Sequence, residues 1–481
     1  MENAISTESA APDRISATAG QLGISAVFPY QRLVVHSILR TVDDPASEEA
    51  RPREIIVLPT GAGKSLCFQL PAAILPGLTL VIFPLLALIA DQKRRLDQLR
   101  LPAAVLTGAT DNQARRRIFE KARCGELRVL LSNPETLATP AVASQLRDLP
   151  VSHLVIDEAH CIIEWGKSFR PAYLELGRLV RDLDAPRVSA FTATASPELQ
   201  RGIADNLFGD ADWSSVAGNP DRPNIHYAVM RPLHVDHTLT WLLRNEPAFR
   251  SDPTLFPRVR RPAIVFCPTR DESERTARLL RTRLRDSRVR FYHAGLSREE
   301  KSAIEGWFFE SRDGILCSTS AYGMGVDKAD IRSVIHRAPP SSVESYMQES
   351  GRAGRDGAPA RAILLAEASD AGEPTTLHHY VAATDCRRRY LLRAMGADGD
   401  CTGCDRCDGD IDPCTVEGRI LHRVMRRPFG MDIDHLPARM AMVGHERGLE
   451  LPPWHRRDVA ALSKRLGQHR RRGIWSRYSS R

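Results

Sequence analysis

Residues Leu58 to Ser65 read LPTGAGKS, and their types and order suit the binding of a nucleoside triphosphate. Glycines let backbone amides close on the phosphates, a lysine reaches the β- and γ-phosphates, and a serine hydroxyl binds Mg²⁺. Leu58 stands where the general pattern has its first glycine. The residues predicted to surround ATP phosphates and Mg²⁺ are Thr60, Gly61, Ala62, Gly63, Lys64 and Ser65.

A pair of carboxylates offers the second part of such a site. Asp157 and Glu158 directly follow the apolar run Leu154–Ile156. A carboxylate at a strand end can hold Mg²⁺ through water, and its neighbour can take a proton from attacking water. We therefore predict that Asp157 binds Mg²⁺ and that Glu158 is the catalytic base.

The elements that must position these groups alternate between apolar strands and helical patterns. This alternation predicts a parallel sheet wrapped by helices, with ligands at the carboxyl ends of the strands. The expected strands of the first domain are Glu54–Leu58, Leu80–Phe83, Val129–Leu131, Leu154–Ile156 and Val188–Phe191.

A second alternation of the same kind follows an irregular bridge from Phe208 to about Pro257. It has no P-loop, but it carries Arg352 and Arg355 in the glycine-bearing run Gln348–Gly357. Two arginines at this spacing suit a charge clamp on a γ-phosphate. The expected strands here are Ala263–Phe266, Arg288–Tyr292, Gly314–Cys317 and Val334–His336.

Composition fits a globular protein with an anionic partner. The chain has 481 residues, a formal net charge of +8 and ten cysteines. Met1–Gly20 lacks the basic and apolar segments of a signal peptide, and Leu78–Ala90 is too short to cross a bilayer. We therefore expect a cytoplasmic protein without a membrane segment.

Five of the cysteines crowd into one short region. Cys401, Cys404 and Cys407 have the spacing of a knuckle whose thiolates select Zn²⁺. A fourth ligand must come from elsewhere, and both Cys386 and Cys414 are near in sequence. The expected role of the ion is structural.

The sequence resembles the RecQ family of ATP-dependent DNA helicases, within helicase superfamily 2. The resemblance covers about Leu22 to Cys407, and its most specific stretches are Leu58–Gln69, Asp157–Tyr173 and Ala321–Gly357. It implies two RecA-like domains with ATP between them, and 3′-to-5′ movement on single-stranded DNA and forked duplexes.

The resemblance also implies roles for individual residues. Gln31 would read adenine, although on local sequence alone the favoured interpretation is a helix-surface residue. Gln348, Arg352 and Arg355 would complete the ATP site, with Arg355 as the arginine finger. The Cys-Arg-Arg start at Cys386 favours that residue over Cys414 as the fourth zinc ligand. The aromatic-rich loop would contact DNA through Trp165, Phe169 and Arg170.

The aromatic-rich loop departs from the family pattern. Ile163-Glu164 and Lys167-Ser168 stand where the family usually has Ser-Gln and His-Asp. This puts the coupling of DNA binding to hydrolysis in question, so a DNA-stimulated ATPase that remodels partner proteins is the alternative function. An RNA helicase is a third interpretation, which the DNA-family cysteine cluster disfavours.

The basic excess of the chain lies in its last part. From Arg419 to Arg481 there are fifteen Lys or Arg and five Asp or Glu, a net charge of +10. This favours contact with duplex DNA, or a solvated extension. The expected organisation is a disordered N-terminus (1–20), two RecA-like domains (21–220 and 221–372), a zinc-binding region (373–415) and a basic tail that is possibly a reduced winged helix (416–481).

Overall fold

The structure is a computed structural model, and it describes residues 13–43, 51–59, 62–166, 170–244, 259–322, 328–366 and 376–409. The chain divides into two units, Met1–Pro220 and Asp221–Arg481. The domain bounds that the sequence suggests stay a prediction. The basic tail and Cys414 lie outside the described residues.

The first unit is built on a parallel seven-stranded sheet with the order β3-β4-β2-β5-β6-β1-β7. Its strands are β1 (Arg53–Val57), β2 (Leu78–Ile82), β3 (Ala103–Leu106), β4 (Val129–Ser132), β5 (Val151–Ile156), β6 (Val188–Thr192) and β7 (Ser214–Ala217). Its helices are α1 (Arg14–Gln21), α2 (Pro29–Asp43), α3 (Lys64–Ile74), α4 (Leu86–Gln98), α5 (Asn112–Arg123), α6 (Pro134–Leu137), α7 (Pro140–Leu146), α8 (Cys161–Gly166), the 3₁₀ turn η2 (Pro171–Tyr173), α9 (Leu176–Leu183) and α10 (Pro197–Leu207).

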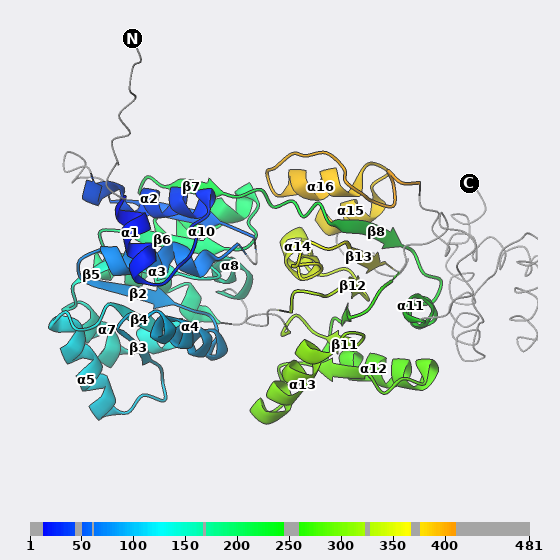
Figure 1. The fold of residues 1–481 in the computed structure, drawn as a ribbon, viewed down its shortest axis with the longest axis horizontal. Helices are drawn as coiled ribbons and strands as arrows, with labels where there is room; N and C mark the ends of the chain where they lie inside the picture. The colour runs from blue at the N-terminus through cyan, green and yellow to red at the C-terminus, as the bar shows by residue number, and fades with distance from the viewer. Residues whose placement is uncertain are drawn as a thin grey trace, which may run out of the picture. The chain divides into compact units, whose positions relative to one another are not determined.

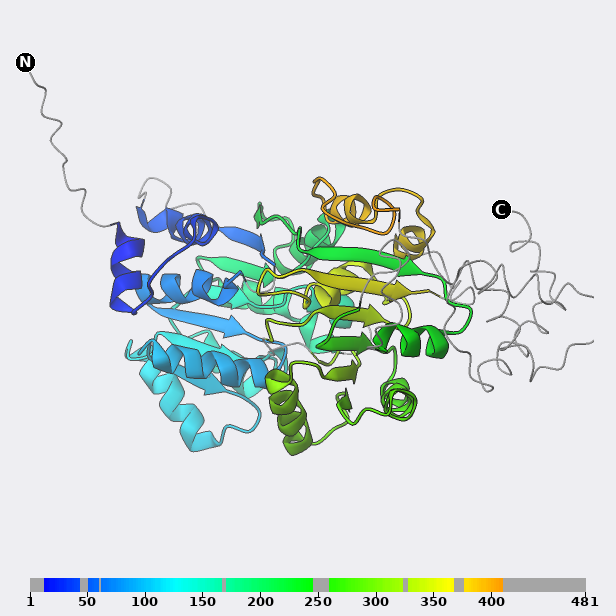
Figure 2. The ribbon, with the colours of Figure 1, turned by 45° about the vertical axis from the view of Figure 1, so that its right-hand side comes forward.

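Both faces of this sheet are buried. Ile55 belongs to the core that includes Phe119 of α5, whereas its neighbour Ile56 belongs to the core that includes Phe68 of α3. Successive side chains of a strand point to opposite faces, so a strand covered on both sides reads as a continuous apolar run. Figures 1 and 2 show the helices around the sheet.

The second unit has a parallel six-stranded sheet with the order β10-β11-β9-β12-β13-β8. Its strands are β8 (Ile225–Met230), β9 (Ala263–Phe266), β10 (Val289–Tyr292), β11 (Ile315–Ser318), β12 (Ser333–His336) and β13 (Ala360–Leu365). Its helices are α11 (Val235–Leu243), α12 (Arg270–Leu284), α13 (Arg298–Glu310), α14 (Val343–Ser350), α15 (Thr376–Ala382) and α16 (Arg387–Ala394). In both ribbon views α15 and α16, in orange, lie alongside β8. The prediction of two parallel α/β domains is confirmed.

Two expectations about the chain's less regular parts are wrong. Arg14–Gln21 is helical rather than disordered, because Ile15 and Ala19 bury their side chains in the core shared with α3. The bridge from Phe208 to Pro257 contains β7, an edge strand of the first sheet, and β8, an edge strand of the second. β7 is mostly exposed and lacks the apolar run that marks a buried strand.

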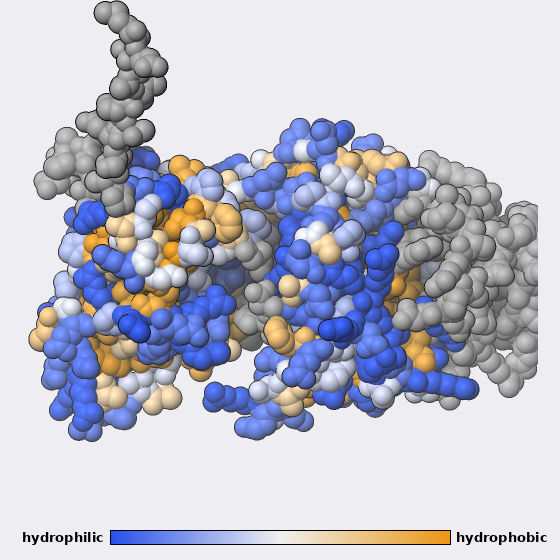
Figure 3. Space-filling view, viewed as in Figure 1, coloured by the Kyte–Doolittle hydropathy of each residue, from blue (hydrophilic) through white to orange (hydrophobic). Residues whose placement is uncertain are grey.

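The surface of the described residues is mixed in character. Figure 3 shows mostly hydrophilic residues over the second unit and several hydrophobic patches over the first, on the face drawn. Phe28 and Leu33 are 55% and 60% exposed and belong to the first unit. Among the described residues, no helix has both the length and the apolar character that crossing a bilayer requires.

Candidate ATP site and cysteine cluster

The P-loop joins β1 to α3, as its sequence predicts. Thr60 and Gly61 lie outside the described residues, but Gly63 caps α3 in the left-handed conformation, at φ +72°. No side chain of a described residue caps the helix at this end, so its first amides are available to an anion. A Cβ on Gly63 would lie 2.6 Å from the Gln31 Nε2 atom, so any other residue here would displace the Gln31 amide.

Gln31 lies on α2 and contacts the P-loop directly. Its Nε2 donates to the Ala62 carbonyl at 2.9 Å, and its Oε1 accepts from the Phe28 amide at 2.9 Å. The Tyr30 hydroxyl also donates to the Ala62 carbonyl, at 2.9 Å. The side chain is 3% exposed. Gln31 therefore steadies the phosphate loop here, and its contact with adenine stays a prediction.

The two carboxylates follow β5 at the same edge of the sheet as the P-loop. Asp157 is buried, and its Oδ1 has no hydrogen-bond partner among the described residues. Glu158 has a left-handed backbone, with φ +50°, and its Oε1 lies 3.6 Å from the Lys64 Nζ atom. Burial and the neighbouring Glu158 raise the pKa of Asp157, although Lys64 opposes them. A buried carboxylate oxygen without a partner suits a divalent cation.

His160 connects the acidic pair to the strand beside it. Its Nδ1 lies 3.1 Å from the Thr192 hydroxyl, and that hydroxyl donates to the Thr194 carbonyl at 3.0 Å. Because the hydroxyl donates its only proton to Thr194, its oxygen accepts from His160, which places the imidazole proton on Nδ1. The same nitrogen lies 3.4 Å from the Glu158 Oε2 atom. The base is thus linked to the end of β6.

A chain of two glutamines reaches the serine predicted to bind Mg²⁺, and sequence reasoning missed it. Gln92 Nε2 donates to the Ser65 hydroxyl at 2.8 Å, and Gln92 Oε1 accepts from Gln69 at 3.1 Å. Gln92 is buried on α4 between Ile89 and Leu96. A glutamine at helical spacing within an apolar stripe was the signal that could have revealed it.

The aromatic-rich loop is only partly described. The side chains of Trp165 and Phe169 lie outside the described residues. Arg170 donates from Nε to Glu135 at 2.6 Å and from Nη1 to the Pro84 carbonyl, and its guanidinium lies over the Tyr173 ring. Arg170 thus binds the segments that follow β2 and β4, and its contact with DNA stays a prediction.

In the second unit the predicted clamp residues surround the end of α14. Gln348 is half-buried within α14, and Arg352 and Arg355 lie in the turn that follows it. Arg352 is buried and Arg355 is half-buried. Sequence reasoning assigned the segment 221–225 to the bridge, yet its side chains contact this turn through Arg222 and Asn224.

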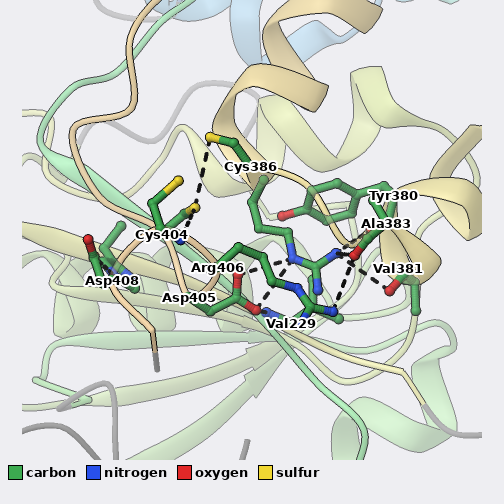
Figure 4. A network of polar contacts seen from close by, with 12 residues as sticks. Val229, Tyr380, Val381, Ala383, Cys386, Cys404, Asp405, Arg406 and Asp408 are labelled. Carbon is green, nitrogen blue, oxygen red and sulfur yellow. Dashed lines mark hydrogen bonds and ion pairs between the residues drawn. The ribbon is translucent and has the colours of Figure 1, made fainter. Parts of the chain in front are cut away.

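The cysteine cluster brings together the four predicted thiols. The Sγ atoms of Cys386, Cys401, Cys404 and Cys407 all lie within 4.8 Å of one another. Sulfur atoms around tetrahedral Zn²⁺ are about 3.8 Å apart, since each Zn–S bond is about 2.3 Å, so the group fits this ion. Backbone amides of Arg389 and Cys407 donate to the thiols of Cys386 and Cys404. Figure 4 shows Cys386 and Cys404 close together beside Asp405.

The cysteine cluster is also tied to the second sheet. Cys404 forms an isolated parallel bridge with Tyr227 of β8, and the Asp405 amide donates to the Tyr227 carbonyl at 3.0 Å. Arg387, which is 2% exposed, donates to Asp405 and to the Tyr380 carbonyl. Backbone hydrogen-bonding groups on the free edge of β8 thus find partners in the segment that carries the thiols.

Both α/β units match known helicase domain families. Residues 28–201 match the DEAD/DEAH box helicase family, and residues 255–357 match the helicase conserved C-terminal domain. The chain is 35% identical over 357 residues to the ATP-dependent DNA helicase RecQ of Synechocystis sp., covering 72% of this chain and 71% of that protein. The chain belongs to the RecQ family.

A second relative and a solved structure of similar fold were also found. The chain is 38% identical over 317 residues to the probable ATP-dependent DNA helicase RecS of Bacillus subtilis, covering 66% of this chain and 61% of that protein. The crystal structure of the helicase MrfA bound to DNA has a TM-score of 0.57 and 20% identity, over 82% of this chain and 55% of that one. The chain spans about three fifths of the length of several curated relatives.

Proposed function

We propose that this chain hydrolyses ATP to move 3′ to 5′ along single-stranded DNA and to separate the strands of forked duplexes. The observation that carries the proposal is the 3.6 Å approach of the P-loop Lys64 to Glu158, beside the buried Asp157. A mobile cation, a Mg²⁺ ligand and a base at one sheet edge are the parts that phosphoryl transfer requires. Membership of a family of ATP-dependent DNA helicases supports DNA as the activator.

Each residue of the site has its own role in phosphoryl transfer. Lys64 and the first amides of α3 bind the β- and γ-phosphates, while Ser65 and Asp157 hold Mg²⁺, which neutralises charge on the phosphate oxygens. Glu158 accepts the proton of the attacking water. Gln348 and Arg352 support the γ-phosphate, and Arg355 supplies the charge that stabilises the transition state.

DNA binding is assigned to the aromatic-rich loop and the basic tail. Trp165 and Phe169 stack on bases, and Arg170 lies next to them in sequence. The tail beyond Arg419 contacts duplex phosphates. Zn²⁺ held by the four cysteines has a structural role, because thiolates fill all four positions of a tetrahedral ion.

The direct test compares ATP turnover without nucleic acid, with single-stranded DNA, with forked DNA and with RNA of the same sequence. We expect stimulation by DNA that RNA does not match. Strand separation is then measured on duplexes with a 3′ or a 5′ single-stranded overhang. Unwinding of the 3′-overhang substrate alone supports the proposed direction, whereas equal stimulation by RNA contradicts the choice of DNA.

The departures in the aromatic-rich loop favour a second candidate function. Glu164 and Lys167 stand where the family usually has Gln and His. If these residues uncouple hydrolysis from strand separation, the chain acts as a DNA-stimulated ATPase that remodels partner proteins. DNA-stimulated turnover without strand separation on any overhang favours this candidate over the helicase.

A further inference from the structure

The turn that carries the two clamp arginines is held by a third arginine. The carbonyls at the C-terminal end of a helix lack intrahelical donors, and a cation there is favoured by the helix dipole. Arg222 supplies both a donor and a cation at the end of α14. Its Nη1 donates to the Gly351 carbonyl at 2.8 Å, and its Nη2 donates to the carbonyls of Ala353 and Gly354 at 3.1 and 2.8 Å.

Asn224 fixes the far side of the same turn. Its Nδ2 donates to the carbonyls of Gly354 and Ala358 at 2.8 and 2.9 Å. Gly354 has φ +55°, and a Cβ there would lie 2.5 Å from the Asn224 Nδ2 atom and 2.7 Å from the Ala358 carbonyl. The turn can therefore adopt only a narrow range of conformations. Arg352 and Arg355 lie within this held segment, between the carbonyls of Gly351 and Ala358, so their positions depend on these contacts.

The segment 221–225 is itself anchored by the cysteine-cluster region. Arg388, which is 1% exposed, donates to the Arg222 carbonyl at 3.0 Å, to the Asp221 carboxylate at 2.5 Å and to the Ile225 carbonyl. The Thr402 hydroxyl donates to the Pro223 carbonyl at 2.7 Å. Arg388 is two residues from Cys386, and Thr402 lies between Cys401 and Cys404. Arg387, which precedes Arg388 on α16, donates to Asp405.

We propose that Arg222 is a positioning residue for hydrolysis, because its guanidinium fixes the turn 351–354. Through Arg388 and Thr402, the segment that carries Arg222 is in turn bound to the cysteine-cluster region. The inference rests on the proposed ATP hydrolysis, in which Arg352 and Arg355 act on the γ-phosphate. A planar guanidinium reaches all three carbonyls at once, whereas an ammonium is a point donor without that fork. Arg222→Lys therefore preserves the charge but loses some of the hydrogen bonds to these carbonyls.

The test measures ATP turnover in Arg222→Ala and Arg222→Lys with single-stranded DNA present. We expect kcat to fall about tenfold or more in Arg222→Ala, which is about 1.4 kcal/mol of barrier, and less in Arg222→Lys. KM for ATP and zinc content should stay near those of the parent protein. Arg231→Ala is the matched control, because Arg231 donates to the Val381 carbonyl rather than to the turn. Unchanged kcat in Arg222→Ala, or a loss in proportion to unfolded protein, overturns the proposal.

Hydrogen exchange separates this inference from the proposed function. Amides of residues 351–358 should exchange at least about tenfold faster in Arg222→Ala, with the rest of the second sheet unchanged. Arg388→Met should also speed exchange there while zinc is retained, and unchanged exchange would refute the link to the cluster. If the parent protein shows no DNA-stimulated turnover, the proposed function fails, and exchange alone decides whether Arg222 holds the turn. If Arg222→Ala does not fold, kcat and hydrogen exchange of Arg222→Lys test the proposal instead.

Discussion

The Nζ atom of Lys64 lies 3.6 Å from the Oε1 atom of Glu158, so the cation of the P-loop faces the predicted base. Both side chains are mostly buried, at 13% and 16% exposure. The attraction between opposite charges is stronger away from water, so each side chain helps to orient the other. The arrival of a triphosphate would draw the lysine toward its phosphates and leave the carboxylate to a water molecule.

Replacing Lys64 by alanine should abolish hydrolysis, because the phosphates lose their mobile positive charge. We expect turnover to fall by at least about a hundredfold, the size of effect seen when a single transition-state contact is removed. Steady-state ATPase assays with single-stranded DNA measure it. Lys93→Ala is the control, since Lys93 pairs with Asp97 on the surface of α4. Turnover near that of the control would reject the P-loop assignment.

Replacing Glu158 by glutamine should preserve binding of ATP with Mg²⁺ and remove hydrolysis. Asp157 still holds the ion, whereas the base is gone, and general-base catalysis contributes about 10²–10⁴-fold. Equilibrium binding of a fluorescent nucleotide and single-turnover hydrolysis are compared in the same preparation. Loss of nucleotide binding itself would show that the roles of the two carboxylates are misassigned.

Mg²⁺ binding should weaken as the pH falls through neutrality. Burial, with Glu158 beside it, raises the pKa of Asp157 to about 7. Below that pH the metal-free carboxyl is increasingly protonated, so a proton competes with the cation; above it the carboxylate is available. The Mg²⁺ concentration for half-maximal nucleotide binding should rise about tenfold from pH 8 to pH 6.

Protonation of the nucleotide contributes to the same titration. Asp157→Asn cannot be protonated in this range, so its pH profile gives the nucleotide's own contribution. Identical profiles for the parent protein and this variant would show that Asp157 does not titrate near neutrality.

Replacing Gln92 by leucine should raise the Mg²⁺ concentration that hydrolysis requires, without loss of fold. The change removes the donor to the Ser65 hydroxyl and leaves Gln69 without its partner. One hydrogen bond is worth about 0.5–1.5 kcal/mol, so we expect about a threefold to tenfold rise in the Mg²⁺ needed for half-maximal turnover. Gln98→Leu, on the exposed face of the same helix, is the control. An equal effect in both variants would show that the change acts through a general perturbation of α4 rather than through the hydrogen bond to Ser65.

Replacing Cys404 by serine should lower zinc content and thermal stability together. The purified parent protein should contain about one zinc per chain. Cys124 is an exposed cysteine of the first unit, so Cys124→Ser should retain the metal. Elemental analysis and thermal unfolding measure the two quantities. A Cys404→Ser protein with unchanged zinc would refute the cluster as a metal site.

The positions of the candidate ATP-site residues could be predicted from the sequence, because each residue follows a local signal. The P-loop follows the apolar strand β1, and Asp157 follows β5, so both had to lie at the carboxyl edge of a parallel sheet. The edge strands β7 and β8 escaped prediction, since they obtain their partners from distant parts of the chain. The helix α1 escaped for a similar reason, because its apolar side chains are few and need α3 to cover them.

Only the tertiary structure decided how these residues are held. Arg222 and Arg170 find their partners far along the chain, and many of those partners are backbone carbonyls. Every residue has a backbone carbonyl, so the sequence does not indicate which carbonyl lacks a donor or which distant side chain will supply one. The three cysteines of the knuckle could be read from their spacing. The place of Cys386 beside them depended on α16 packing against β8, which brings residues distant in sequence to one edge of the sheet.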